Sequence, residues 1–249
     1  MMLQGTRFGK ILETRGGMFG YTMGSGQTSS FVGGRGSLVR VGEPTRAYGK
    51  YGQCAVFNGT NQAYTLPSFN VGPGCSFGVR FKHTATTASM TLMDFPQSVG
   101  GGTVIYMRAN EGGTGKINIA GLSPFFNVVS SSSSFNDGLW HSAVGVYGSN
   151  SGTMTLFVDG KQEGSAAATV PRFLSDYPRV ASERWFGADY NWYNGSLADP
   201  FCVQTILTLQ DVRLYHTDMG KYGEDNPSLG LPFIRSRPWI YYQQMRRAA

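Results

Sequence analysis

The sequence is poor in charged residues and has no long apolar run. Only 14% of its 249 residues are Asp, Glu, Lys or Arg, whereas 41% are hydrophobic. This balance excludes a mainly disordered chain. No apolar stretch approaches the roughly 20 residues that span a bilayer, and residues 1–10 lack the apolar block of a secretory signal. We therefore expect a chain that is neither exported nor in contact with a membrane.

Cysteine is scarce as well. The chain has three cysteines, an odd number, and none of them forms a C-x-x-C spacing or stands near a pair of histidines. This pattern supports neither a disulfide framework nor a zinc site. We expect Cys54, Cys75 and Cys202 to be buried thiols in a reducing compartment.

The sequence also lacks motifs that indicate catalysis. It has no Gly-x-Ser-x-Gly turn and no Gly-x-x-x-x-Gly-Lys phosphate loop, although it contains 35 glycines. Its carboxylates are scattered, without the Glu-x-Asp-x-x-Glu spacing that places a nucleophile and an acid on one strand. The histidines His83, His141 and His216 lie far apart and have no ligand-type neighbour. We predict that the protein is not an enzyme.

What the chain does contain is the composition of a β protein. Glycines, aromatic residues and Ser/Thr runs follow no collagen or heptad period, which indicates short strands joined by turns. We divide the chain into a Gly/Arg-rich extended arm (1–53), a β domain (54–216) and a basic, aromatic arm (217–249). The strands that we predict are 55–57, 64–66, 76–82, 90–95, 104–108, 116–120, 125–129, 140–147, 153–158, 161–165, 197–209 and 211–215.

Two positions allow sharper predictions. Asp159-Gly160 tolerates the positive φ of a tight hairpin turn, so residues 161–165 should return antiparallel to 153–158. Pro200 lacks a backbone donor, so the strand over 197–209 should be broken near it. The predicted architecture is all-β, a two-sheet antiparallel sandwich with extended terminal arms.

Five segments within residues 54–216 resemble, in order, the landmarks of the laminin-G-like, concanavalin A-like jelly-roll family. They are Phe57–Tyr64, Ser76–Phe81, Asp137–Ala143, Leu156–Lys161, and Asn194–Leu197 taken with Asp211–Tyr215. The resemblance implies two curved antiparallel sheets packed face to face. It differs at Ala198–Gln210, which separates two elements that are nearly adjacent in the family.

The flanking segments resemble those of jelly-roll proteins in tailed-phage virions. Residues 1–50 hold seven Lys or Arg and two Glu, and residues 217–249 hold five Lys or Arg and three acids, so the ends carry +5 and +2, and the rest of the chain carries −1 of the formal +6 charge. Basic ends favour an acidic partner or a partner protein. Because these residues are dispersed, no specific nucleic-acid partner is predicted.

The resemblance implies a virion structural protein, made in a host cytoplasm, that decorates a capsid or belongs to a tail. Its partners would be the major capsid or tail protein, and it would form a homo-oligomer, with a trimer as one option. Solvated ends, and a tail that covers the domain's own edge, remain alternatives. The residues predicted for the assembly interface are Arg7, Arg15, Arg35, Arg40, Phe233, Arg235, Arg237, Trp239, Tyr241 and Tyr242.

A different function, glycan binding by an adhesin or receptor-binding module, is indicated by one aromatic segment. Aromatic faces stack on sugar rings, while Asp and Asn side chains bond to hydroxyls. The same aromatic residues would equally serve packing within the domain or against a neighbour. The candidate residues are Trp185, Asp189, Tyr190, Asn191, Trp192 and Tyr193. No cofactor is predicted, and Asp159 and Asp189 are weak calcium candidates, because each is also explained as a turn former.

Overall fold

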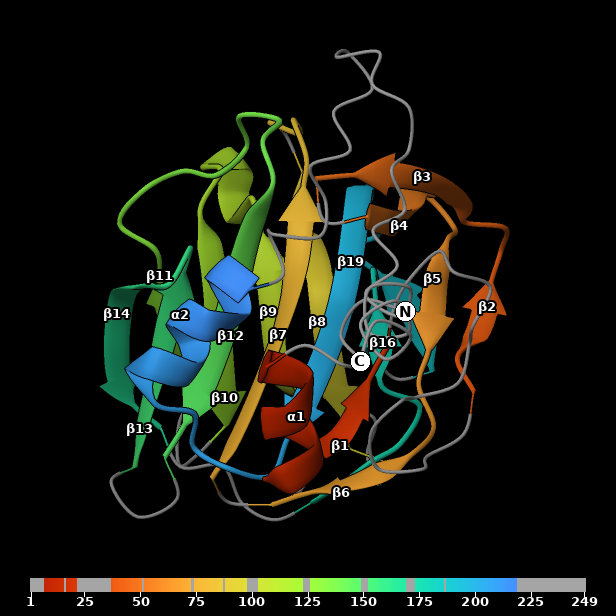
Figure 1. The fold of residues 1–249 in the computed structure, drawn as a ribbon. Helices are drawn as coiled ribbons and strands as arrows, with labels where there is room; N and C mark the ends of the chain where they lie inside the picture. Colours follow the sequence, from red (N-terminus) through yellow and green to blue (C-terminus); the bar gives the residue numbers. More distant parts are fainter. Residues whose placement is uncertain are drawn as a thin grey trace, which may run out of the picture.

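Two antiparallel sheets packed face to face form the molecule (Figure 1). The computed structural model describes residues 7–15, 17–21, 37–50, 52–72, 74–86, 88–97, 103–122, 126–148, 152–168, 173–185 and 187–218. The eight-stranded sheet has the order β14 (Lys161–Ala167), β13 (Thr153–Val158), β12 (His141–Tyr147), β7 (Cys75–Lys82), β19 (Asn194–Val203), β4 (Gly52–Asn58) and β3 (Thr45–Gly49). Its eighth strand, β1 (Gly17–Gly20), pairs with β19.

The second sheet has seven strands, and smaller elements surround it. Its order is β11 (Phe126–Ser130), β10 (Ile117–Leu122), β9 (Thr103–Ala109), β8 (Met90–Pro96), β16 (Arg179–Val180), β5 (Ala63–Thr65) and β2 (Val39–Val41). The remaining elements are the pairs β6 (Phe69–Val71) with β15 (Phe173–Ser175) and β17 (Glu183–Trp185) with β18 (Ala188–Tyr190), the 3-10 turn η1 (Glu111–Gly113), and the helices α1 (Arg7–Thr14) and α2 (Leu209–Asp218). The prediction of an all-β two-sheet sandwich is confirmed.

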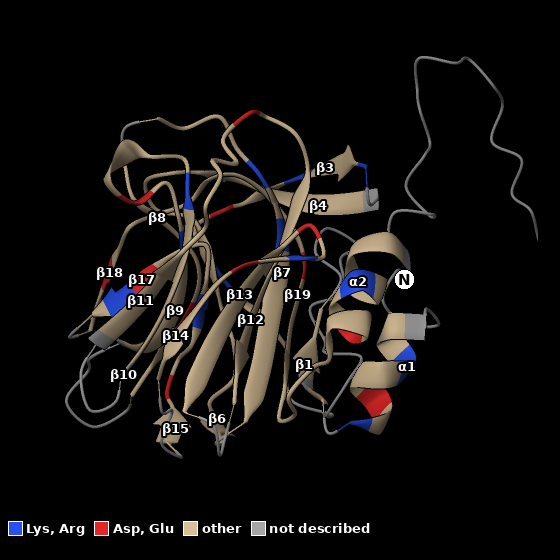
Figure 2. Ribbon diagram, turned by 90° about the vertical axis from the view of Figure 1, so that its left-hand side faces the viewer, with Lys and Arg blue, Asp and Glu red and all other residues tan. Residues whose placement is uncertain are grey.

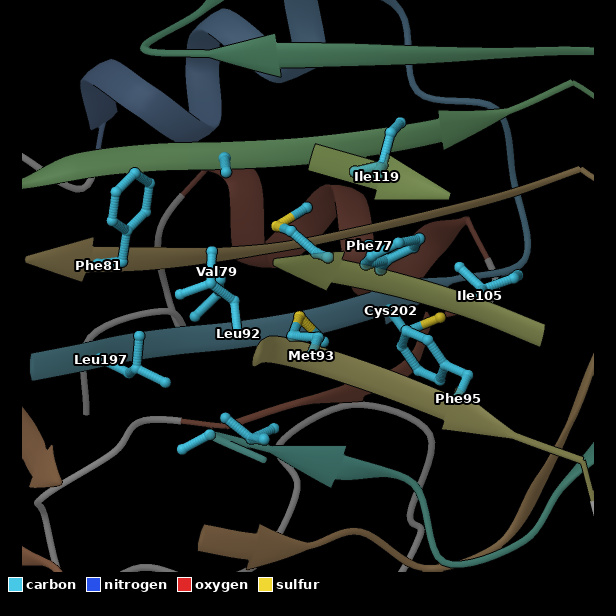
Figure 3. Close-up of a cluster of buried hydrophobic side chains, with 14 of the residues drawn as sticks. Phe77, Val79, Phe81, Leu92, Met93, Phe95, Ile105, Ile119, Leu197 and Cys202 are labelled. Carbon is cyan, nitrogen blue, oxygen red and sulfur yellow. The ribbon is translucent and has the colours of Figure 1, made fainter. Parts of the chain in front are cut away.

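The main core lies between the sheets and follows the period-two pattern of the strands. Along β7, Phe77, Val79 and Phe81 are fully buried in this core. They pack with residues of the opposite sheet such as Leu92 and Phe95 of β8 (Figure 3). At roughly 25 cal/mol per Å² of apolar area, burial of these side chains supplies the main driving force for folding.

Most of the strands predicted in the middle of the chain are present. The hairpin turn between β13 and β14 has Asp159 at φ 50° and Gly160 at φ 74°, the left-handed pair that matches the twist of a two-residue hairpin. Lys161 pairs with Val158, as predicted. Cys54, Cys75 and Cys202 are buried free thiols.

The prediction of a strand over residues 211–215 is wrong, because these residues belong to helix α2. The helix begins with a reciprocal cap: the backbone N–H of Thr208 donates to Asp211 Oδ2 at 2.9 Å, and the N–H of Asp211 donates to Thr208 Oγ1 at 3.2 Å. This is the capping-box spacing, which satisfies backbone donors that the first turn leaves open. The cap therefore determines helix rather than strand here.

Strand β19 ends at Val203, so the predicted strand over 197–209 extends too far. Pro200 lies inside β19 rather than at its end. The pairing with β7 shifts between Ala198 and Phe201, and Asp199 between them has φ 50°. A β-bulge thus accommodates the proline without ending the strand.

Residues 1–53 were predicted to form an extended arm, and their described part folds onto the sandwich instead. Phe19 of β1 is 1% exposed and opposite Cys202 of β19. In α1, Phe8 and Leu12 lie on one helix face at i and i+4 and are fully buried. The ring of Phe8 lies 5.0 Å from that of Phe201 and 4.9 Å from that of Tyr215. Buried aromatic contacts therefore hold α1 and β1 on the sandwich.

Helices α1 and α2 lie side by side on the outer face of the eight-stranded sheet (Figure 2). They form a second apolar cluster with β12, β13 and β19. Neither the helices nor any other described element is a long apolar helix of the kind that crosses a membrane. Of the predicted C-terminal arm, only Thr217 and Asp218, at the end of α2, lie among the described residues.

Candidate functional site

The hairpin β17–β18 lies on the outer face of the seven-stranded sheet, on the opposite side of the sandwich from α1 and α2 (Figure 2). Main-chain and side-chain bonds tie it to β8. The backbone N–H of Arg184 donates to Asp94 Oδ2 at 2.8 Å, and the N–H of Thr91 donates to the carbonyl of Asn191 at 2.8 Å. The hairpin thus has a fixed position over β8.

One side of the hairpin faces β9 through a buried carboxylate. Glu183 is 3% exposed, and its Oε2 accepts from Nη2 and Nε of Arg108 at 2.6 and 3.0 Å and from Nδ2 of Asn191 at 2.8 Å. Arg108 also donates to Glu111 Oε1 at 3.1 Å, and its guanidinium lies 4.0 Å from the ring centroid of Tyr106. A carboxylate is buried at acceptable cost only when it is paired in this way. Desolvation lowers the pKa of Arg108, but Glu183, Tyr106 and Glu111 together outweigh it and the pKa is raised.

The other side of the hairpin faces β16. Asp189 Oδ1 accepts from Nε of Arg179 at 3.0 Å, and Nη1 of Arg184 lies 3.7 Å from the same oxygen. The guanidinium of Arg184 lies 5.7 Å from the ring centroid of Tyr177. These bonds fix the hairpin laterally, so that it cannot tilt toward either neighbouring strand without breaking ion pairs.

Backbone strain is concentrated in the same region. Tyr177, Ala181 and Asn191 have φ values of 53°, 75° and 48°. Asn tolerates this left-handed conformation, but Tyr and Ala rarely adopt it, and strained residues of that kind gather at functional sites. Tyr177 and Ala181 are therefore held by their contacts in a conformation that they do not prefer.

Two aromatic side chains of the hairpin are exposed to solvent. Trp185 is 42% exposed and Tyr190 is 52% exposed. Glu183 is the strand partner of Tyr190, and Ala188 is the partner of Trp185, so alternation places both aromatic side chains on one face as diagonal neighbours. We refer to Trp185 and Tyr190 as the aromatic pair. An exposed pair of this kind on a rigid support can stack on a flat apolar surface such as a sugar ring.

The six candidate glycan residues differ in exposure and in contacts. The aromatic pair is exposed and Trp192 is partly buried, while Asp189 and Asn191 are engaged with the ion pairs described above. Tyr193 is fully buried in the main core, and its hydroxyl donates to the carbonyl of Lys82 at 3.1 Å. Its inclusion in a surface site is therefore wrong, because its ring serves core packing.

Donors of the chain engage both carboxylate oxygens of Asp159 and one oxygen, Oδ1, of Asp189, the two weak calcium candidates. Asp189 is paired with Arg179, as above, while Asp159 accepts from His141 Nδ1 at 2.7 Å and from the backbone N–H of Ser142 at 2.9 Å. In the part of the chain that the structure describes, no three His, Cys, Asp or Glu side chains are placed to hold a metal ion.

His141 joins two acidic turns. Its Nε2 lies 3.0 Å from Asp137 Oδ1, and its Nδ1 bonds Asp159. Burial lowers the pKa of His141, but the two carboxylates outweigh burial and raise it. Ser142 Oγ and Asp159 Oδ1 both approach Nδ1 of His216, at 3.0 and 3.6 Å. A catalytic triad needs its nucleophile and its acid on opposite ring nitrogens, so this cluster has the geometry of a structural clamp.

Few of the predicted assembly residues are described. Nη1 of Arg15 is paired with Asp211 of α2 at 2.6 Å, and Arg40 lies 3.8 Å from Glu43. Arg7 is the first residue of α1. The others, Arg35, Phe233, Arg235, Arg237, Trp239, Tyr241 and Tyr242, lie outside the described residues.

The polar residues that support the aromatic pair were not identified from the sequence. Arg108 and Glu183 are 75 positions apart and meet because β9 and β17 come together in the fold, whereas Arg108 and Glu111 are an i, i+3 pair. The period-two alternation of β9 places Arg108 opposite the core-facing Met107, which is the one signal that could have indicated an outward-facing arginine.

The two antiparallel sheets packed face to face are those of a jelly-roll sandwich. The chain belongs to the concanavalin A-like lectin/glucanases superfamily: its laminin G-type family model matches residues 58–215. No curated protein matches the sequence.

Solved structures share the fold at low sequence identity. Domain 4 of AbnA, an extracellular arabinanase of Geobacillus stearothermophilus, solved with arabinotriose, has a TM-score of 0.63 and 16% identity, with 80% of this chain and 97% of that chain covered. The binding domain of Paraclostridial Mosquitocidal Protein 1 has a TM-score of 0.63 and 11% identity, with 82% and 52% covered. The botulinum neurotoxin serotype D binding domain has a TM-score of 0.61 and 12% identity, with 81% and 51% covered. The chain thus spans about half of each toxin binding domain.

Proposed function

We propose that this protein is a non-catalytic carbohydrate-binding module and that the aromatic pair is its stacking surface. The observation that carries the proposal is the exposure of Trp185 and Tyr190 on a hairpin whose polar side chains are tied to the sheet. Neighbouring exposed apolar side chains, unlike a single one, offer a contiguous surface of the kind that meets a ligand or a partner.

The support of the hairpin favours binding without rearrangement. Glu183 and Asp189 each hold the hairpin through an arginine of the sheet, Arg108 and Arg179. Because the surface is already ordered, little conformational entropy is lost when a ligand docks, and more of the contact energy appears as affinity.

The relatives support the proposal at the level of fold. One is an arabinanase domain solved with arabinotriose, and two are toxin binding domains. The reported relatives include no virion protein, and the two described ion pairs of the predicted assembly residues are within the chain. The virion role, its capsid or tail partners and the homo-oligomer therefore remain predictions from the sequence.

A polysaccharide-binding assay with matched aromatic variants tests the proposal. The probes are immobilised arabinan, xylan, galactomannan, polygalacturonate and alginate, and the variants are Trp185→Ala and Tyr190→Ala. Loss of one stacking ring should weaken binding about tenfold or more, with no change in melting temperature. Tyr48→Ala is the control, because Tyr48 is 82% exposed on the edge strand β3 of the other sheet.

Two outcomes would count against the proposal. One is that the unmodified protein binds none of the probes. The other is that it binds but loses affinity equally in the Tyr48, Trp185 and Tyr190 variants, since the stacking surface would then lie elsewhere.

A further inference from the structure

Glu111 is a partly exposed carboxylate beside the buried ion pairs of the hairpin. Its side chain is 35% exposed and stands on the turn η1, directly after β9. Its Oε1 accepts from Nη1 of Arg108 at 3.1 Å, and its Oε2 accepts from Nδ2 of Asn118 at 2.8 Å. Each oxygen is thus oriented by one donor of the sheet.

The turn that carries Glu111 is itself fixed. Asn110, fully buried with φ 58°, donates through Nδ2 to the carbonyl of Ala88 at 2.9 Å and accepts at Oδ1 from the backbone N–H of Gly115 at 2.8 Å. The backbone N–H of Gly112 donates to Ser89 Oγ at 3.3 Å. The Glu111 carboxylate is therefore held in place from the backbone as well as from its own oxygens.

Glu111 and the aromatic pair belong to one surface. Arg108 bonds both Glu111 and Glu183, and Glu183 is the strand partner of Tyr190. A ligand with a ring on the aromatic pair therefore has the Glu111 carboxylate beside it, one arginine away.

The chemistry of this carboxylate favours hydroxyl donors. A carboxylate offers about four lone-pair sites, and the two described bonds to Glu111 occupy one on each oxygen. Neighbouring hydroxyls of a sugar are donors spaced to reach both oxygens, and hydrogen bonds to an ionised acceptor are the stronger kind.

The local charge disfavours an anionic ligand. Glu111 is the more exposed member of its ion pair with Arg108, since its side chain is 35% exposed and that of Arg108 is 16% exposed. A uronate or sulfate beside Glu111 would meet a like charge.

We infer that the ligand is a neutral glycan, with one ring stacked on the aromatic pair and with hydroxyls that donate to the carboxylate of Glu111. The inference rests on the proposed function and deepens it by naming the ligand class and a specificity-determining residue.

The test compares neutral and acidic probes with a charge-removing variant. Binding of the neutral arabinan, xylan and galactomannan and of the acidic polygalacturonate and alginate is measured in about 0.3 M NaCl, where attraction to the overall positive charge is screened. Binding that depends on Trp185 should occur with a neutral probe, and Glu111→Gln should weaken it about tenfold to a hundredfold. Glu43→Gln is the control. The Glu43 side chain is 88% exposed, and Glu43 follows β2, the strand at the edge of the seven-stranded sheet away from β9.

Folding of the variants is checked by thermal melting, and Glu111→Asp, which retracts the carboxylate by one methylene, provides a second variant that should also weaken binding. Trp185-dependent binding to acidic probes alone would overturn the inference, as would binding to a neutral probe that is unchanged in both Glu111 variants. In either case the carbohydrate-binding function itself would stand. Absence of Trp185-dependent binding to any probe would instead overturn the proposed function.

Discussion

Replacing His83 with glutamine should remove much of the sensitivity of this fold to mild acid. His83 follows β7 and is 3% exposed, with its ring 5.9 Å from that of Phe81 and 6.0 Å from that of Tyr193. Among the described residues, neither of its ring nitrogens has a hydrogen-bond partner. Burial is the main cause that lowers the pKa of His83 from 6.5 to about 4, with a smaller contribution from the charge of His141.

The sign of the effect follows from linkage between protonation and folding. Because the folded pKa lies below the unfolded pKa, the unfolded chain binds a proton at His83 first as the pH falls. Stability is therefore complete above pH 6.5 and declines as the pH drops toward 4. Each pKa unit is worth 1.36 kcal/mol, so the loss is about 2 kcal/mol at pH 5 and about 3 kcal/mol at pH 4. A domain of this kind is stable by only about 5 to 15 kcal/mol, so the effect is easy to measure.

Urea unfolding of the wild type and His83→Gln between about pH 4 and pH 7 provides the measurement. A buried glutamine costs stability at every pH, so only the difference in pH dependence between the two proteins bears on His83. The wild type should lose about 3 kcal/mol more than the variant between pH 7 and pH 4. Parallel stability curves would refute the reasoning, since they would mean that His83 is hydrated or protonated in the folded state.

Two further predictions concern the clamp at His141 and the cap of α2. The pKa of His141 is raised, since the hydrogen bonds with its two carboxylates outweigh burial. The stabilisation from protonated His141 is therefore present below pH 6.5 and is lost as the pH rises through the raised pKa. The His141→Gln variant should lower the urea midpoint at pH 5.5 more than at pH 8.5. Equal losses at the two pH values would contradict the raised pKa of His141. Thr208→Ala removes the oxygen that accepts from the N–H of Asp211 and should cost about 1 kcal/mol of unfolding free energy by urea titration, whereas Thr217→Ala, at the far end of α2, should cost much less.

The fold was predictable where local pattern and turn chemistry agree. Asp159-Gly160 fixes a hairpin by its own conformational preference, and residues 76–82 alternate as a buried strand must. The segment 211–215 misled because Val212 and Leu214 alternate like strand residues, although Thr208 and Asp211 carry a capping box. The N-terminal segment misled because glycine-rich composition suggests an arm, whereas its few aromatic side chains are fully buried by distant partners.

The candidate site was predictable only in part. The sequence identified an aromatic segment, but nothing local distinguishes the exposed Trp185 and Tyr190 from the buried Tyr193, because exposure is decided by where the hairpin lies on the sheet. The pairing of Arg108 with Glu183 could not be found, since the two residues are 75 positions apart and meet across separate elements. The i, i+3 spacing of Arg108 and Glu111 was a local signal of their ion pair.

The placement of the two helices has a consequence for handling the protein. Helix α1, near the start of the chain, and α2, the last described helix, meet on the face opposite the hairpin, where Arg15 bonds Asp211 (Figure 2). A fluorophore or a surface tether attached to an exposed residue of either helix, such as Lys10 or Arg213, would therefore point the aromatic pair toward the solution. The fold is thus suited to oriented display, with attachment on the face of the two helices and the aromatic pair on the opposite face.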